Sequence, residues 1–268
     1  MKDIYEEMIE VSQGIAASFP PPRFYACCKE WLDLSRAVFS QEEPVLKCRE
    51  LVHRVLKDDF GHGLEHAEKV AVEAGALAYI EGARLSRGDA ERREAGVLVQ
   101  IAGLLHDLRR GEKNHATSSA LAARKILGEF SFSPENGSYI VEAIANHEAF
   151  VAPKKIDSPI GQVISDALYD SDKFRWGPDN FTITLWQMLR FSQASIVPLI
   201  RRFPKGMRGI AEIKDTFRTE TGRTYGPEFI DLGLRIGEKI YEFLQERFAA
   251  ELKLEKTALS KWGNRETG

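Results

Sequence analysis

The chain has 268 residues, of which 43% are hydrophobic and 29% are charged, a composition typical of a globular protein that buries a large core. Its formal net charge of -3 provides no basic footprint for a nucleic-acid polymer, so we expect none as a partner. No apolar run approaches the roughly 20 residues that cross a bilayer, and the acidic start MKDIYEEMIE is unlike a secretory signal, so we expect a cytoplasmic protein without membrane contact.

Helical periodicity runs along almost the whole chain and predicts an all-α fold. The stretch 62–82 repeats small and apolar residues at a spacing of 3.6, and 95–105 has only one polar residue, Gln100, so that helix should be buried on nearly all sides. The alternation in FTITLW (181–186) is a weak strand signal. The expected helices, in chain order, cover 3–17, 24–38, 44–57, 62–82, 95–105, 115–128, 136–147, 158–172, 183–202 and 207–217, with a long helix after Pro227.

The sequence contains no internal repeat, low-complexity segment or linker-like change of composition. We therefore expect one compact domain made of an N-terminal helical extension (1–45), a core (46–180) and C-terminal helices packed on that core (181–268). The cysteines Cys27, Cys28 and Cys48 form no CxxC pair and no disulfide framework, which predicts reduced, buried thiols.

Histidines and aspartates occupy inward-facing positions on several of these helices. His66 shares a helical face with Val70, and His106 and Asp107 end the most buried helix. Each histidine alone could be a core residue bonded to a carbonyl. A buried carboxylate, however, costs several kcal/mol unless it is paired, hydrogen-bonded or bound to a metal. Imidazoles clustered with carboxylates remove that cost by binding a divalent transition ion, and the shortage of thiolates argues against structural zinc.

Five segments resemble the HD-domain superfamily of metal-dependent phosphohydrolases: GHGLEHAEKV (61–70), LLHDLRR (104–110), HA (115–116), NHE (146–148) and DSDKF (170–174). The resemblance runs from about residue 50 to 180, so the expected core 46–180 corresponds to the HD domain and the predicted fold is an HD helical bundle. By position, it implies that one metal is bound by His66, His106, Asp107 and Asp172.

Binuclear members of this family add two histidines between the His-Asp pair and the last aspartate, and His115 and His147 occupy that interval. Asp107 would then bridge two ions. The common last motif of the family is Asp-Ala-Asp, which here reads Asp170-Ser171-Asp172, with Asp172 as the ligand and Asp170 as a supporting residue.

The resemblance implies an enzyme that cleaves a phosphoester bond of a nucleotide or other small phosphorylated compound with metal-activated water. The cofactor would be one or two divalent ions, drawn from Fe, Mn, Ni, Co or Mg. Besides Asp107, the implied catalytic residues are Arg110, at a position where many members carry a phosphate-contacting cation, and Lys173. His62, one helical turn before His66, either touches the substrate or a metal-bound water, or faces solvent.

Two other functions fit the same residues. The superfamily also includes mixed-valent di-iron oxygenases with the same six-ligand pattern, and a catalytically silent metal-binding or regulatory module is a third possibility. Residues 1–45 and 182–268, which lie outside the region of resemblance, either shape substrate choice or form the surface of a homodimer.

Overall fold

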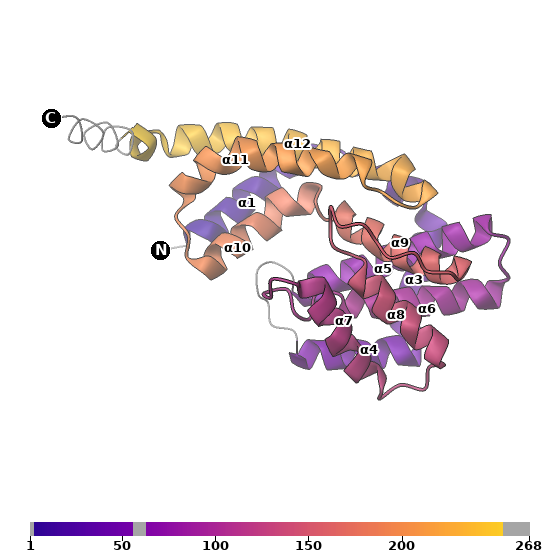
Figure 1. Cartoon of the computed structure of the whole chain (residues 1–268). Helices are drawn as coiled ribbons and strands as arrows, with labels where there is room; N and C mark the ends of the chain where they lie inside the picture. The colour runs from indigo at the N-terminus through magenta and orange to yellow at the C-terminus, as the bar shows by residue number, and fades with distance from the viewer. Residues whose placement is uncertain (1–2, 56–62, 254–268) are drawn as a thin grey trace.

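The computed structural model describes residues 3–55 and 63–253, and within these ranges every regular element is helical, which confirms the predicted all-α fold (Figure 1). Two short elements are not α-helices: the π-helix η1 (Asn180–Thr184) and the 3₁₀-helix η2 (Glu212–Asp215). The α-helices are α1 (Ile4–Ala16), α2 (Phe24–Cys27), α3 (Lys29–Gln41), α4 (Glu43–Val55), α5 (Leu64–Arg84), α6 (Asp89–Leu105), α7 (His115–Leu127), α8 (Pro134–Ala145), α9 (Pro159–Phe174), α10 (Leu185–Ser192), α11 (Ile196–Ala211) and α12 (Glu220–Arg247).

The centre of the fold is α5, which packs along α6 and α9 and also contacts α3 and α12. The approach of α5 to α6 depends on small residues. A Cβ atom added at Gly103 of α6 would lie 2.7 Å from the Cα atom and 2.9 Å from the nitrogen of Ala71 in α5. Only glycine therefore permits this spacing between α5, which begins near the predicted ligand His66, and α6, which ends at His106.

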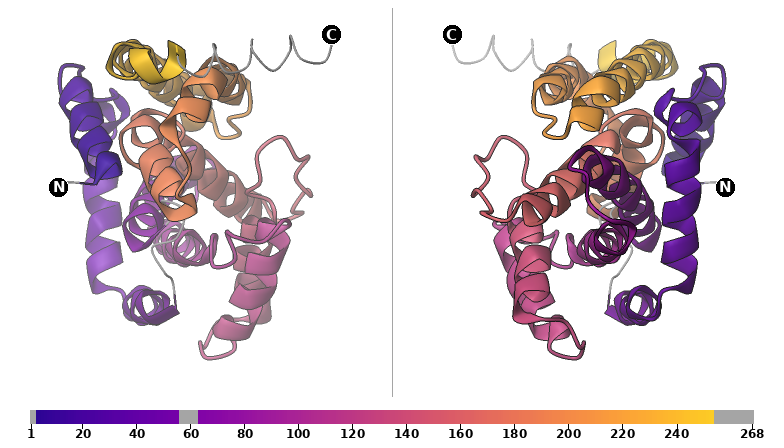
Figure 2. Two further views of the ribbon diagram at one scale, coloured as in Figure 1. Left: turned by 90° about the vertical axis from the view of Figure 1, so that its left-hand side faces the viewer. Right: turned by 90° about the vertical axis from the view of Figure 1, so that its right-hand side faces the viewer.

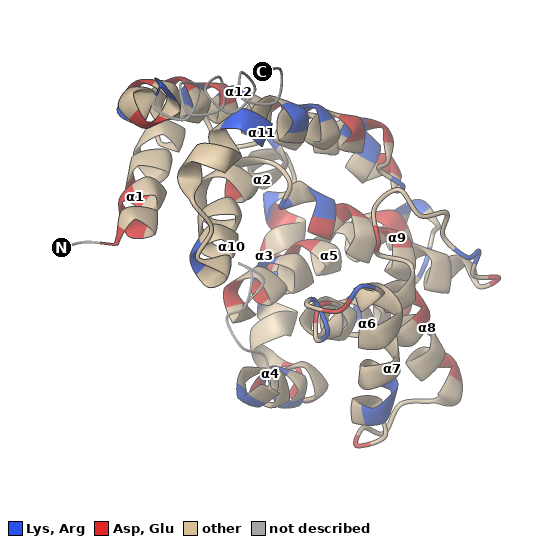
Figure 3. Ribbon diagram, turned by 60° about the vertical axis from the view of Figure 1, so that its left-hand side comes forward, with Lys and Arg blue, Asp and Glu red and all other residues tan. Residues whose placement is uncertain are grey.

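The remaining helices form two groups around this centre. Helices α3 to α9 make up one part of the molecule, whereas α11 and α12 lie side by side along the other, with α1 and α10 next to them (Figures 1 and 2). The exposed side of α11 carries basic residues, visible in Figure 3: Arg201, Arg202, Lys205 and Arg208. Contacts of α12 with α9 and α5 join the two parts, and one apolar core runs through both.

The helix predicted over 183–202 is wrong, because the chain breaks there. Gln193 adopts a left-handed conformation with φ 49°, which ends α10, and α11 begins at Ile196. The sequence carries one signal for this break, Pro198, which lies in the first turn of α11, where a proline is tolerated. The weak strand signal in FTITLW corresponds to η1 and the start of α10. The region 207–217, expected to form a separate helix, contains the end of α11 followed by η2.

The last long helix was predicted to follow Pro227, but α12 begins at Glu220 and contains this proline. One local and one tertiary hydrogen bond hold the turns before Pro227. The Thr219 side chain caps Gly222 N at 2.7 Å, and the Thr221 backbone N–H donates to Glu81 Oε1 at 2.9 Å. Both offset the cost of an internal proline, and the contact with Glu81, which is distant in sequence, is not revealed by the local pattern.

The cysteine prediction needs one correction, since Cys28 and Cys48 are buried but Cys27 is exposed. None of the helices in the described ranges has both the length and the apolar composition required to cross a membrane.

Candidate metal centre

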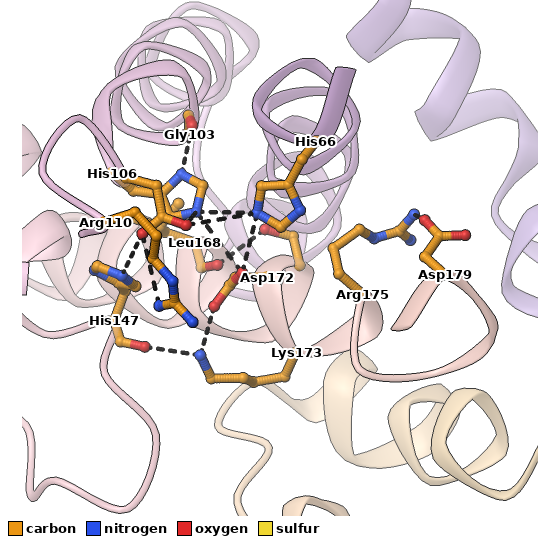
Figure 4. A network of polar contacts seen from close by, with 12 residues as sticks. His66, Gly103, His106, Arg110, His147, Leu168, Asp172, Lys173, Arg175 and Asp179 are labelled. Carbon is orange, nitrogen blue, oxygen red and sulfur yellow. Dashed lines mark hydrogen bonds and ion pairs between the residues drawn. The ribbon is translucent and has the colours of Figure 1, made fainter. Parts of the chain in front are cut away.

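Six side chains predicted as ligands come together where α5, α6, α7, α8 and α9 meet (Figure 4). They occupy different positions in or next to their helices. His66 lies in the first turn of α5, His106 and Asp107 follow the last turn of α6, and His115 is the first residue of α7. The complete set is His66, His106, Asp107, His115, His147 and Asp172.

Asp107 faces two separate groups of histidines, one with each carboxylate oxygen. Its Oδ2 lies 3.4 Å from His106 Nε2 and 3.9 Å from His66 Nε2. Its Oδ1 lies 3.4 Å from His147 Nε2 and 3.9 Å from His115 Nε2. Within each group the potential ligand atoms are all within 4.8 Å of one another. A carboxylate in this arrangement can contribute one oxygen to each of two ions.

Asp172 completes the first group from the side of α9. Its Oδ1 lies 3.5 Å from His66 Nε2 and 3.7 Å from His106 Nε2. The two imidazole Nε2 atoms are themselves 3.3 Å apart. Three helices thus direct nitrogen and oxygen donors toward one small volume.

Backbone carbonyls set the orientation of two of the imidazoles. His106 Nδ1 donates to the carbonyl of Gly103 at 2.7 Å, and His147 Nδ1 donates to the carbonyl of Ile144 at 2.6 Å. A carbonyl oxygen only accepts, so Nδ1 carries the hydrogen, and in the neutral ring Nε2 keeps its lone pair. In both residues that lone pair faces Asp107, which is the tautomer a metal ligand requires.

The electrostatic environment of the first group favours a cation. Burial lowers the pKa of His106, but the carboxylates of Asp107 and Asp172 outweigh burial and raise it to about 10. Burial acts to raise the pKa of Asp172, yet the Lys173 ammonium and hydrogen bonds from His106 and His66 hold it well below its usual range. The same negative potential that attracts a proton to His106 would attract a divalent ion.

The second group differs, because Arg110 already brings a positive charge to it. Arg110 Nη1 donates to His115 Nε2 at 2.8 Å and lies 3.9 Å from Asp107 Oδ1. Burial, followed by Arg110 and His147, lowers the pKa of His115 to about 4, so this imidazole is neutral near pH 7. Asp107, His115 and His147 could hold an ion only if the guanidinium left His115, and the Arg110 side chain is 33% exposed.

The donor set fits a divalent transition ion. Imidazole nitrogens and carboxylate oxygens are the ligands that Fe, Mn, Co and Ni accept, and the sequence segments forming the cluster contain no cysteine. His147 Nε2 is buried and makes no hydrogen bond within the described part of the chain. A buried lone pair of this kind is costly unless something binds it, and a metal ion would satisfy it.

Lys173 is part of the cluster but is almost completely buried. Its Nζ donates to the carbonyl of His147 at 2.9 Å and to Asp172 Oδ2 at 2.5 Å, with the Tyr169 ring 4.8 Å away. Because the ammonium binds Oδ2 of Asp172, the other oxygen, Oδ1, stays directed at His66 and His106. We therefore interpret Lys173 as a residue that positions the predicted ligand Asp172, since its buried ammonium is not available to contact a substrate.

Asp170 points away from the predicted ligands. Its Oδ1 accepts from Arg218 N at 2.8 Å, and its Oδ2 accepts from Thr219 N at 2.8 Å and Thr219 Oγ1 at 2.7 Å. Burial raises the pKa of Asp170 to about 7 against the effect of these hydrogen bonds. Asp170 thus supports the metal centre only indirectly, because its hydrogen bonds hold α9, which carries Asp172, against the start of α12. His62 lies outside the described residues.

The sequence interpretation missed a buried ion pair that joins α5 to α9 near the site. Arg175 Nη2 contacts Glu73 Oε2 at 2.6 Å, both side chains being 6% exposed, and Arg175 Nη1 donates to Asp179 Oδ2 at 2.5 Å. Tyr25 also donates to Glu73 Oε1 at 2.8 Å. A signal for this pair is present in the sequence, since Glu73 lies on the same inward helical face as His66.

No protein-family model matches the chain, and the curated proteins contain no significant match to it. Two solved structures match the chain in a comparison of structures. One is Bacillus subtilis YpgQ in complex with ADP, 17% identical over 73% of this chain and 95% of that chain, with a TM-score of 0.48. The other is a predicted HD superfamily hydrolase from an uncultured Thermotogales bacterium, 21% identical over 86% of this chain and 93% of that chain, with a TM-score of 0.35. The helical fold and the buried His/Asp cluster of this chain are compatible with an HD domain.

Proposed function

We propose that the protein is a metal-dependent phosphohydrolase that cleaves a phosphoester bond of a nucleotide or other small phosphorylated compound. The observation that carries the proposal is the position of Asp107, whose two oxygens face two separate groups of buried histidines. Divalent ions held there would supply Lewis acidity to a phosphoryl oxygen and to a water molecule. No serine or cysteine nucleophile is then required.

In this proposal the protein's own residues hold the metal, fix the tautomer of its imidazole ligands and bind the phosphate. His66, His106, Asp107 and Asp172 would hold one ion, to which neutral imidazoles would add no charge. The carbonyls of Gly103 and Ile144 keep two imidazoles in the ligand tautomer.

Arg110 is the residue best placed to bind the phosphate. Its guanidinium lies at the second histidine group and is partly exposed, whereas Lys173 is buried behind Asp172. Once released from His115, the guanidinium could clamp two phosphate oxygens bidentately, which an ammonium cannot do. Arg110 thereby contributes positive charge as the ester bond breaks.

The proposal is tested by assaying phosphate release from a panel of phosphorylated metabolites with Mn²⁺, Ni²⁺, Co²⁺, Fe²⁺ and Mg²⁺ in turn. We expect metal-dependent release with at least one substrate. Asp107→Asn should abolish it, because the amide offers one oxygen in place of two. Asp231→Asn on the exposed side of α12 is the matched control and should retain full activity.

The di-iron oxygenase is the competing outcome of the same experiment. Protein that retains iron and consumes oxygen with an organic substrate, and that releases no phosphate from any ester, would replace the hydrolase proposal.

A further inference from the structure

A second feature of the site is a pocket of about 190 Å³ whose lining includes His66 but not Asp107. It lies between the first turn of α5 and the segment formed by η1 and α10. Pockets that enclose a whole small-molecule ligand are larger, roughly 300–1,000 Å³. A pocket of this size next to a predicted metal ligand therefore suits one part of a substrate whose other part lies at the metal centre.

The charged groups at this pocket neutralise one another. Lys69 Nζ lies 3.0 Å from Glu65 Oε1 and 3.7 Å from Asp179 Oδ2. Asp179 also accepts from Arg175 Nη1 at 2.5 Å. Among the described residues that line the pocket, no unbalanced positive charge remains to bind a second phosphate, so this lining favours an uncharged group.

Two residues with neutral polar side chains line the same pocket, Thr184 with a hydroxyl and Gln187 with an amide. Neither has a hydrogen-bonding partner among residues 3–55 and 63–253. Together they offer donors and acceptors, and Leu64 and Ile183 add apolar surface beside them. This combination suits a ring that carries hydroxyl or amide groups.

The backbone supports a binding role for this segment. Residues Asn180–Thr184 form a π-helix, and π-helical turns inside helices occur frequently at functional sites. Thr184 ends this π-helix and Gln187 lies within the helix that follows directly, α10.

We propose that this pocket binds the uncharged, hydroxyl-bearing part of the phosphorylated substrate, such as a sugar ring, and that Thr184 and Gln187 determine the specificity for it. The inference rests on the proposed phosphohydrolase function. It assigns the reacting phosphate to the metal centre and the neutral remainder to the pocket beside His66.

The experiment compares two kinds of ester in the metal-loaded protein: the sugar or nucleoside phosphate that is cleaved fastest, and para-nitrophenyl phosphate, which has no sugar. The variants are Thr184→Val and Gln187→Leu, which keep side-chain size and remove hydrogen bonding. Each should lower kcat/KM for the sugar ester by roughly 3- to 10-fold, the loss of about one net hydrogen bond. Cleavage of para-nitrophenyl phosphate and the metal content should change by less than about 2-fold, since the metal centre is untouched.

Ser192→Ala, at the exposed end of α10, is the matched control and should behave as the wild type. Equal losses on both esters, no loss on either, or cleavage restricted to esters without hydroxyl groups would overturn the pocket assignment while the hydrolase proposal survives. Calorimetric binding of the sugar phosphate separates the two proposals further. Binding that Thr184→Val weakens, without any hydrolysis, supports the pocket and refutes the hydrolase; absence of both binding and hydrolysis refutes both.

Discussion

Replacing Gly103 with alanine tests whether the close contact of α5 and α6 builds the metal centre. The added Cβ would meet Ala71 Cα at 2.7 Å and Ala71 N at 2.9 Å, and backbone atoms cannot move aside as a side chain can. Overpacking costs about 1–3 kcal/mol, and the upper part of that range applies here. The better helix propensity of alanine returns about 1 kcal/mol. We therefore expect Gly103→Ala to lower the free energy of unfolding by about 1–2 kcal/mol.

The same substitution should also disturb the metal centre. The carbonyl of Gly103 accepts from His106 Nδ1, and the neighbouring helix carries His66. Separation of the two helices should weaken metal binding by about 10- to 100-fold, as loss of a supporting contact does.

The assay is thermal unfolding followed by circular dichroism, together with calorimetric titration of Mn²⁺. For a chain of this size the stability loss corresponds to a fall in Tm of about 2–8 °C. Gly14→Ala in α1 is the control, because nothing lies within 4 Å of its added Cβ, and it should be neutral or stabilising by up to about 1 kcal/mol. A Gly103→Ala protein as stable as this control would refute the argument that glycine is required for the helix contact.

Three further substitutions probe the supports around the site. Glu73→Ala leaves Arg175 buried without its main partner and should lower the free energy of unfolding in urea by roughly 3–5 kcal/mol. The Glu73→Met, Arg175→Met double variant should recover most of this loss, whereas a loss below about 1 kcal/mol in the single variant would contradict a buried ion pair. Asp170→Ala removes three hydrogen bonds to the start of α12 and should lower the free energy of unfolding by about 3 kcal/mol, while the protein retains its metal. Loss of the metal without loss of stability would instead indicate that Asp170 is a metal ligand. Arg110→Met frees His115 Nε2, so a second Mn²⁺ should bind more tightly in calorimetric titration, while kcat/KM for phosphate esters should fall. An unchanged second binding step would show that the guanidinium does not compete with a metal ion for His115.

The sequence predicts the helices and the site best where the signal is local. The apolar run before His106 and the spacing of Val70 and Ala74 after His66 mark helices whose inner faces carry the ligands. Their order along the chain was sufficient to relate them to a known family. The structure brings these residues together, although they lie in or next to five different helices.

Features that depend on contacts between distant segments could not be predicted. The start of α12 is held by Asp170 and Glu81, which lie far from it in sequence, and the break at Gln193 uses a residue with no strong preference for the left-handed conformation. Similarly, the sequence offered both Arg110 and Lys173 as candidate catalytic cations, whereas their burial makes Lys173 a positioning residue and leaves Arg110 as the candidate phosphate ligand.

Metal analysis of the wild type and Asp107→Asn tests the account most directly. Both proteins are exposed to Mn²⁺, Fe²⁺, Co²⁺ and Ni²⁺ in turn, freed of unbound ions, and checked for equal helical content by circular dichroism. We expect the wild type to retain one or two equivalents of a divalent ion and Asp107→Asn to retain none. Wild-type protein that binds no ion, or an Asp107→Asn variant that binds as much as the wild type, would contradict the assignment of this cluster as a metal centre.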